Sequence, residues 1–447
     1  MSYDPVLYSR MLTELTLGFH IIFATIGVGV PVMVALAEWT GIKRNDPYYL
    51  LLARRWTRGF VITVAVGVVT GTAIGLQLSL LWPSFMRIAG QAIALPLFLE
   101  TFAFFFEAIF LGIYLYTWDR FKKKWTHFLL LIPVVLGSSA SAFFITTVNA
   151  FMNTPQGFKL QDGVITDLQP IAAMFNPATP TKVAHVLVSA YMTCAFILAA
   201  IAAASLLKNR VQLYHRKALK LTMTAALVFS VTTILVGDLS GKFLAKYQPE
   251  KLAAAEWHFE TAGKAPLVIG GILTADNEIK YGLKIPFALS ILAHANPNAE
   301  VQGLNETPID ERPPLLVHYI FDLMVTIGIL LPLLSLLYFW MARKYQNRHY
   351  PRWIVRLIVW SGPLAVLGIE SGWVYAEVGR QPWILRGYMK TAEGATTSTH
   401  VDLMLVLFCL LYLVIGLTVI KVLGKIFRGN DLQEELLAKG IEGGKAK

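Results

Sequence analysis

The chain has 447 residues, of which 55% are hydrophobic and 15% charged, and its mean hydropathy is +0.56. Soluble globular proteins are roughly half apolar and about a quarter charged, so this composition excludes a soluble domain and predicts an all-α integral membrane protein. The 39 Lys and Arg against 28 Asp and Glu do not call for a nucleic-acid partner. The basic residues lie between apolar segments, where they report membrane topology.

Nine apolar segments are long enough to cross about 30 Å of hydrocarbon, which takes about 20 helical residues. We predict transmembrane helices at 15–37, 58–82, 94–117, 128–151, 182–207, 218–240, 316–341, 353–377 and 401–424. The chain then divides into six helices within 1–240, a long connection at 241–315, three helices within 316–424 and a tail at 425–447.

Basic residues follow every second predicted helix. They gather at 54–55, 120–124, 208–217, 343–352 and 421–428. Short cytoplasmic connections are enriched in Lys and Arg. We therefore predict an outer N-terminus, a cytoplasmic C-terminus and an outer position for the long connection.

Four side chains able to bind a metal ion lie on four different predicted helices, within about three turns of the outer surface. They are His20, His185, Met324 and Glu377. Ionisable groups inside a membrane are functional by default, and their agreement in depth favours a shared site. Simpler alternatives remain for each. A histidine can hydrogen-bond a neighbouring helix, Met324 can fill a packing gap, and Glu377 can pair with Arg380 three residues on.

The third predicted helix carries two carboxylates in the stretch LFLETFAFFFEAIF. Glu100 and Glu107 are seven residues apart, so they share a helix face with about 10 Å between them. Burial favours the neutral form of a carboxyl group, which suits groups that pass protons. We interpret the pair as a proton path toward the outer site. Interhelical hydrogen bonds or ion pairs are the alternative.

The long connection contains the stretch KLAAAEWHFE at 251–260. This stretch favours a short amphipathic helix at the membrane interface. Lys251 and Glu256 would there be able to bind and deprotonate a hydroxyl group. Charged interfacial segments are common, so the residues alone favour a solvated loop.

These motifs, in this order, resemble subunit I of the cytochrome bd family of quinol oxidases, in its type with a short Q-loop. GWVYAEVGRQPW at 372–383 is similar to the family's most recognisable signature. YSRMLTELTLGFH at 8–20 and LETFAFFFEAIF at 99–110 resemble its segments with a haem-binding histidine and a glutamate pair. VAHVLVSAYMTCAFI, GDLSGK and KLAAAEW resemble further blocks, so the likeness extends from residue 8 to about 424.

The resemblance implies three haems. His185 and Met324 would be the axial ligands of a low-spin haem b, a ligand pair that raises the reduction potential. His20 and Glu377 would each hold one of the other two haems, a high-spin haem b and a haem d, or a third haem b in place of haem d. The other implied roles are quinol binding by Lys251 and Glu256, and contacts with haems or their propionates by Arg10, Trp373 and Arg380.

The implied activity is that of a terminal oxidase. Quinol would be oxidised at the outer face and O₂ reduced to water, with protons drawn from the cytoplasm along Glu107 and Glu100, so that turnover would charge the membrane without a pump. The implied partners are a second large membrane subunit and small single-span subunits, in a bacterial or archaeal cell membrane. One departure from the family is Asp322, which stands where an arginine often precedes the methionine ligand by two positions.

Two other classes of function remain open. A proton-coupled transporter could use the membrane carboxylates as its path, although the sequence shows no internal repeat of the kind transporters often have. A quinone-linked cytochrome that does not reduce O₂ would need paired histidines on two helices. Only three of the nine histidines lie in or at the edge of helices that enter from outside (His20, His185 and His318). A haem–copper oxidase would need several more deep histidines.

Overall fold

The computed structural model describes residues 3–161, 163–208, 212–345, 350–429, 432–438 and 440–441. Within these ranges nine helical segments are long and apolar enough to cross a membrane, which confirms the predicted number. Arg210 and Arg348, two of the basic residues that predict the orientation, lie outside the described residues.

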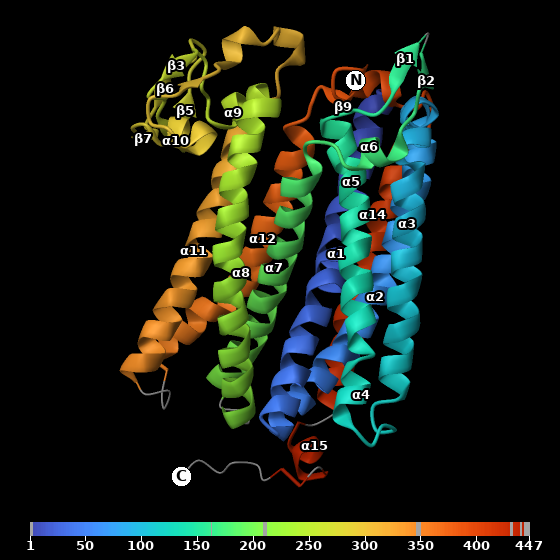
Figure 1. Ribbon diagram of the computed structural model, residues 1–447, viewed down its shortest axis with the longest axis vertical. Helices are drawn as coiled ribbons and strands as arrows, with labels where there is room; N and C mark the ends of the chain where they lie inside the picture. The colour runs from blue at the N-terminus through green and yellow to red at the C-terminus, as the bar shows by residue number, and fades with distance from the viewer. Residues whose placement is uncertain are drawn as a thin grey trace.

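The spans run up and down in one bundle (Figure 1). They are α1 (Pro5–Lys43), α2 (Pro47–Leu81), α3 (Pro83–Tyr116), α4 and α5 together (Lys124–Phe128 and Leu131–Asn153), α7 (Thr179–Leu207), α8 (Gln212–Tyr247), α11 (Val317–Lys344), α12 (Arg352–Val378) and α14 (Val401–Gly429). Most are longer than predicted, because a helix satisfies its own backbone hydrogen bonds and can continue beyond the hydrocarbon.

Local chemistry explains where the long helices begin. The Asp4 side chain accepts hydrogen bonds from the N–H groups of Val6 and Leu7, and Pro5 occupies the first turn of α1. Asp46 and Pro47 repeat this arrangement at the start of α2. An acidic cap satisfies otherwise unpaired N–H groups, and proline suits the first helical position because it lacks an N–H there.

Two helices extend past the bounds predicted for the membrane spans. Helix α8 continues to Tyr247, into the long connection. An ion pair between Asp238 and Lys242, four residues apart, supports this extension. Helix α14 runs to Gly429, into the tail, and α15 (Leu432–Ala438) lies beyond it.

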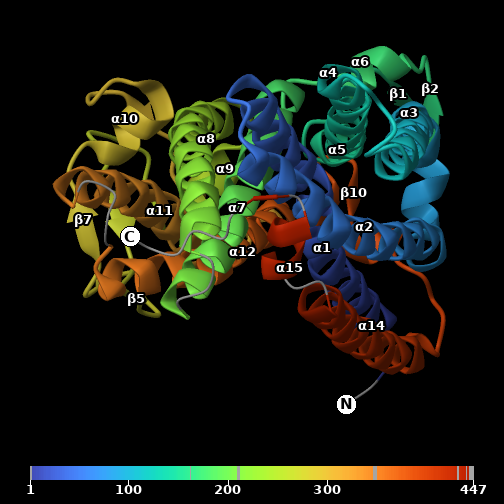
Figure 2. The same ribbon diagram turned by 90° about the horizontal axis from the view of Figure 1, so that it is seen from below.

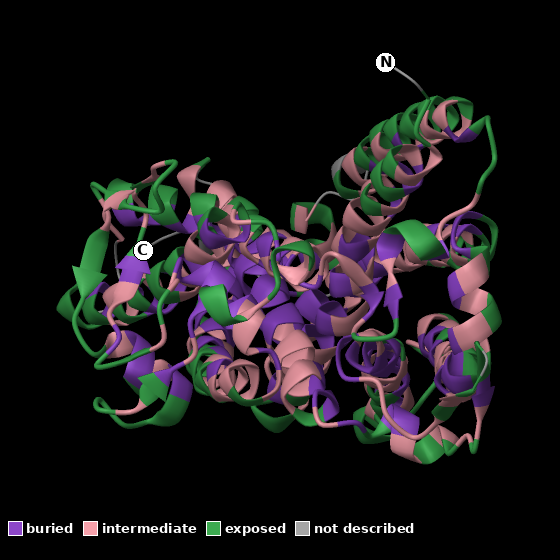
Figure 3. Ribbon diagram, turned by 90° about the horizontal axis from the view of Figure 1, so that it is seen from above, coloured by how far each residue is buried: buried purple, intermediate pink, exposed green. Residues whose placement is uncertain are grey.

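The helices form two groups that meet mainly where α7 packs against α1 and α5. One group consists of α7, α8, α11 and α12, and the other of α1, α2, α3 and α5, with α14 against α1 and α2. Figure 2 shows α14 at the edge of the second group. Gly29 lets α1 and α7 approach closely, since a Cβ there would lie 2.5 Å from Cys194 Sγ. Figure 3 shows buried segments gathered at the centre, where the groups meet.

Short elements fold over one end of the bundle, which we call the loop end. The helices are α6 (Pro170–Met174), α9 (Pro249–Ala255), α10 (Ala288–His294) and α13 (Thr391–Gly394), with 3₁₀ turns η1 (Leu304–Glu306) and η2 (Ile309–Glu311). Five antiparallel strand pairs complete it: β1–β2 (Lys159–Gln161, Val164–Thr166), β3–β8 (Ala262–Gly263, Glu300–Val301), β4–β7 (Leu267–Ile269, Leu283–Ile285), β5–β6 (Ile272–Leu273, Ile279–Lys280) and β9–β10 (Trp383–Leu385, Met389–Lys390). The long connection is therefore folded rather than a solvated loop.

Candidate functional site

The four candidate iron ligands lie near the loop end. Helices α1, α7 and α11 begin at that end and carry His20, His185 and Met324 in their first half (Figure 1). Helix α12 ends there, with Glu377 as its last residue but one. Helices α7, α11 and α12 belong to the first group, and α1 of the second group packs against α7.

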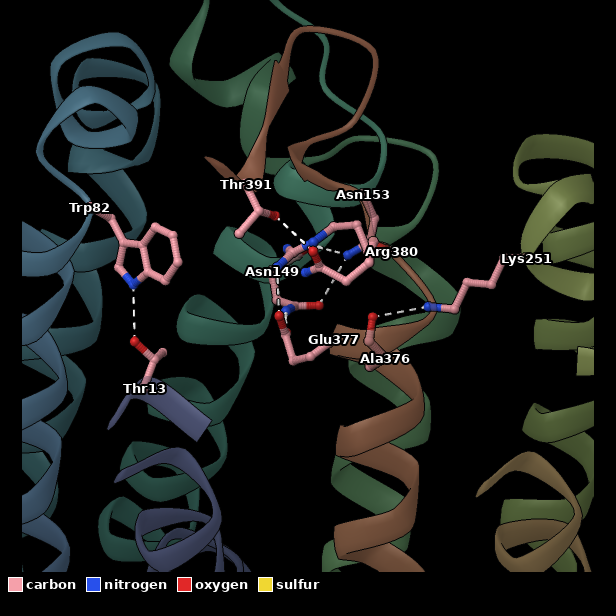
Figure 4. A network of polar contacts seen from close by, with 10 residues as sticks. Thr13, Trp82, Asn149, Asn153, Lys251, Ala376, Glu377, Arg380 and Thr391 are labelled. Atoms are coloured by element: carbon pink, nitrogen blue, oxygen red, sulfur yellow. Dashed lines mark hydrogen bonds and ion pairs between the residues drawn. The ribbon is translucent and has the colours of Figure 1, made fainter. Parts of the chain in front are cut away.

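Glu377 is held by two side chains. Arg380 Nη2 donates to its Oε2 at 2.5 Å, and Asn149 Nδ2 of α5 donates to its Oε1 (Figure 4). The ion pair that the three-residue spacing allows therefore forms. Arg380 Nε and Nη1 are buried and have no hydrogen-bond partner among the described residues. Two free buried donors on an arginine fit an anionic group such as a haem propionate.

His185 and Met324 both lie beside glycines. His185 Nδ1 is buried without a hydrogen-bond partner in the described part of the chain, and a Cβ on Gly237 of α8 would lie 3.6 Å from its Cε1. Met324 Sδ is 3.3 Å from the position that a Cβ would take on Gly372 of α12. An unpaired imidazole, a thioether and the space left by two glycines fit a haem with His and Met axial ligands.

The ring of His20 is oriented by helix α2. Its Nδ1 lies 2.8 Å from Thr70 Oγ1, and the Thr70 hydroxyl donates its own proton to Val66 O at 2.8 Å. The hydroxyl therefore accepts from Nδ1–H, which leaves the lone pair on Nε2. Metal-bound histidines commonly donate their second ring N–H in this way, so Nε2 is the atom suited to bind iron.

Two further carboxylates near this site were missed in the sequence. Glu370 lies two turns before Glu377 on α12. Its Oε1 is buried without a partner among the described residues, and its Oε2 is 3.8 Å from a Cβ placed on Gly18 of α1. Glu14, one turn before Gly18, interacts electrostatically with Glu377. Glu370 and Glu377 are seven residues apart, the same spacing as Glu100 and Glu107. This spacing is the sequence feature from which Glu370 could have been predicted.

The carboxylates of α3 both lie on the side that packs against α5. Ser141 Oγ donates to Glu100 Oε1 at 2.8 Å. Glu107 is buried, and its Cβ lies 3.0 Å from a Cβ placed on Gly137. Helix α5 also carries Asn149, two turns beyond Ser141, so one helix connects the carboxylate pair with Glu377.

Two other predicted site residues, Arg10 and Trp373, form no polar contact with the candidate iron ligands in the described part of the chain. Arg10 is exposed near the start of α1, one turn from Glu14. Trp373 is half-buried, four residues before Glu377. Among the described residues, no hydrogen bond or ion pair joins either of them to the candidate ligands.

Lys251 lies against the end of α12, contrary to the expected solvated loop. Only 4% of this residue is exposed. Its Nζ donates to Ala376 O at 3.0 Å and lies 4.8 Å from the centre of the Tyr375 ring. Figure 4 shows Lys251 reaching toward the helix turn that carries Glu377. A candidate quinol-binding residue and a candidate iron ligand are thus neighbours.

Glu256 follows α9 and is also buried, with 1% exposure. Its Oε2 accepts the Val268 N–H at 3.1 Å, and its Oε1 has no partner among the described residues. Burial raises the pKa of Glu256 to about 8, against the effect of the Val268 hydrogen bond, and burial lowers the pKa of Lys251 to about 7. Both groups can therefore exchange a proton near neutral pH, but no direct contact joins them.

Asp322, the departure from the family pattern, ties the long connection to α11. Its Oδ2 accepts the Gly270 N–H at 2.5 Å and lies 3.4 Å from His318 Nε2. His318 in turn contacts the carbonyl oxygens of Ala255 and Gly270 at 2.7 and 3.1 Å. Asp322 thus holds a loop segment in place.

The chain is similar to known proteins in sequence and in fold. The family model "Cytochrome bd terminal oxidase subunit I" matches residues 8–431. A solved bd oxidase structure from Geobacillus thermodenitrificans has 67% sequence identity and a TM-score of 0.92, covering 96% of this chain and 99% of that one.

Two relatives come from Bacillus subtilis strain 168. One, provisionally named cytochrome bd menaquinol oxidase subunit I, is 42% identical over 97% of this chain and 99% of its own length. The other, cytochrome bd ubiquinol oxidase subunit 1, is 31% identical over 89% and 88%. With nine candidate membrane helices in its described residues and these matches over nearly its whole length, the chain belongs to the cytochrome bd terminal oxidase subunit I family.

Proposed function

We propose that this chain is the subunit of a quinol:O₂ oxidoreductase that oxidises quinol at the loop end, on the outer membrane face, and reduces O₂ to water. One observation carries the proposal. Lys251 of the long connection hydrogen-bonds to Ala376, the residue before Glu377. A residue suited to quinol therefore contacts the helix turn that carries a residue suited to iron. The names of the relatives, which are quinol oxidase subunits, support quinol as the reductant.

The donor set supports three haems. His185 and Met324 would be the axial ligands of a low-spin haem b, and His20 and Glu377 would each hold one of the other two, a haem b and a haem d or a third haem b. The free donors of Arg380 would bind a propionate. When bound, these groups supply one-electron transfer and an iron that binds O₂.

The residues of the long connection would handle the quinol protons. Glu256 has an unpaired buried oxygen and would accept a hydroxyl proton as general base. Lys251 would hold the neighbouring quinol oxygen by hydrogen bonding. Protons leave on the side where quinol is oxidised, whereas protons for water would enter from the opposite end along Glu107 and Glu100. Turnover would therefore be electrogenic without a pump.

The surface of α3 supports a membrane partner. Phe98, Phe102, Phe105 and Ile109 expose a contiguous apolar face along this helix. Such a face fits a second large membrane subunit, and the remaining exposed helix surfaces fit lipid or small single-span subunits. The bacterial relatives support a bacterial cell membrane as the location.

The purified oxidase in proteoliposomes tests the proposed function. We expect haem bands in the reduced-minus-oxidised spectrum, O₂ uptake with quinol, and a membrane potential during turnover. A transporter would lack the haem bands, and a cytochrome that does not reduce O₂ would show the bands without O₂ uptake. Normal O₂ uptake without a membrane potential would disprove the electrogenic part.

Glu256→Gln tests the role of the loop carboxylate. Because the pKa of Glu256 is raised to about 8, its basic form grows as the pH rises through 8. Quinol oxidation by the native protein is therefore expected to increase between about pH 7 and 9, and the variant is expected to lose this increase and about 100-fold in kcat/KM. Glu260→Gln, on an exposed residue of the same connection, serves as the control. The same pH profile in both variants would disprove a base role.

Glu107→Gln tests the proton path. Glutamine keeps the size of the side chain beside Gly137 but cannot pass a proton, so we expect O₂ uptake to fall about 10-fold or more with little change in the KM for quinol. Glu107→Asp, which keeps the carboxyl group, is expected to retain much of the activity. Undiminished turnover in Glu107→Gln would contradict the assignment.

A further inference from the structure

The β4–β7 strand pair of the long connection, which we call the loop ribbon (267–285), turns an aliphatic face outward. Leu267 lies opposite Ile285, and Ile269 opposite Leu283. Residues two apart on a strand point to the same side, so these four side chains form one face. Leu283 is 63% exposed, and Ile269 and Ile285 are also exposed.

The opposite face of the loop ribbon is directed at the protein only along β4. Val268, between Leu267 and Ile269, is buried, whereas its partner across the strands, Lys284, is exposed. A sheet in water normally packs its apolar side inward and exposes its polar side. Here the aliphatic face is exposed at Ile269, Leu283 and Ile285, while Leu267 packs against a buried apolar cluster of the loop end. Ile272 and Tyr281 add exposed apolar surface beside it.

Hydrogen bonds place the loop ribbon at the height where a membrane helix begins. Tyr319 Oη donates to Gly271 O at 2.9 Å, and Gly270 is bound by His318 and Asp322. Helix α11 starts at Val317, so these contacts lie within its first two turns, less than about 10 Å along the axis. Figure 1 shows β5 and β7 beside the upper ends of α8 and α11, and Figure 2 shows them at the edge of the molecule.

Exposed apolar residues at the start of α11 lie beside the loop ribbon, since Tyr319 binds Gly271. Leu316, Tyr319 and Leu323 are exposed apolar residues at the start of α11. The loop ribbon also carries Lys280 and Lys284, both exposed. Aromatic and basic side chains beside aliphatic ones are typical of the membrane interface, where the rings lie at headgroup level and lysines pair with anionic lipid.

We propose that the loop ribbon lies in the outer interface of the lipid bilayer, with its aliphatic face at the boundary between headgroups and acyl chains. Its inner face contacts the quinol side of the protein, because the Val268 N–H binds Glu256. If the chain has the proposed function, on which this part of the inference rests, the ribbon would bring quinol dissolved in the lipid next to Glu256 and Lys251.

Spin labels on the complete oxidase in lipid nanodiscs test the position of the ribbon. Cysteines replace Leu283 and Ile285 one at a time, in a background where exposed Cys409 is serine and buried Cys194 is kept. Ile309→Cys is the control, because Ile309 is an aliphatic residue of the same connection that is 84% exposed and lies outside the ribbon. Collision rates are measured with O₂, which concentrates in lipid, and with a water-soluble nickel chelate.

We expect the labels at 283 and 285 to collide mainly with O₂ and the label at 309 mainly with nickel. Nickel-dominated collisions at 283 and 285 would show that the ribbon faces water. Low rates with both reagents would show that protein covers it. Either result overturns the proposal. The measurement needs no turnover, so its failure is distinguishable from a failure of the quinol oxidase assignment.

Discussion

Replacing His185 with alanine is expected to remove the low-spin haem b signal from the redox difference spectrum and to abolish quinol-dependent O₂ uptake. Its Nδ1 is buried and has no hydrogen-bond partner among the described residues, so the change is expected to remove the proposed iron ligand without breaking a hydrogen bond of that atom. The other haem signals are expected to remain, because His20 and Glu377 lie on α1 and α12.

Met324→Leu is the matched variant at the second proposed ligand of the low-spin haem b. Leucine and methionine are close in volume, so packing beside Gly372 is kept while the thioether is lost. We expect the low-spin signal to become high-spin rather than to disappear. His400→Ala, at an exposed histidine next to α14, is the control and should leave the spectrum unchanged. A normal low-spin spectrum in either ligand variant would overturn the assignment of this pair.

Glu377→Gln is expected to have the second large effect, the loss of one haem together with O₂ reduction. It also leaves the Arg380 guanidinium buried without its counter-charge, since the Arg380 side chain is 4% exposed. Removing one partner of a buried ion pair costs about 3–5 kcal/mol. The variant should therefore also melt at a lower temperature than the native protein.

A double variant separates these two effects. In Glu377→Gln with Arg380→Leu the unpaired charge is gone, so the melting temperature should recover relative to the single Glu377→Gln variant. Haem content is expected to stay low, because the anionic ligand is still missing. If the double variant regained its full haem content, Glu377 would be a structural partner of Arg380 and not an iron ligand.

Much of the fold could be predicted from local sequence. The number of membrane helices follows from stretches of apolar residues, because each helix closes its own backbone hydrogen bonds and can be recognised without knowledge of its neighbours. The Glu377–Arg380 ion pair is also local, because the turn after α12 brings the Arg380 N–H to the Glu377 carbonyl oxygen and keeps the two residues close. Helix ends were less accurate, as α8 shows, because polar residues such as Asp238 and Lys242 continue a helix outside the hydrocarbon.

The surroundings of the candidate site depend on contacts that local patterns do not contain. Asn149 binds Glu377 from 228 residues away, and Lys251 reaches Ala376 across 125 residues. A buried pair of Glu38 and His127, 89 residues apart, likewise fixes α4 at the opposite end of the bundle. Sequence spacing predicts which residues share a helix face, but the partner of that face depends on how whole helices pack. For this reason the stretch 251–256, which the sequence alone predicted to be a solvated loop, is buried in the structure and packs beside the candidate site.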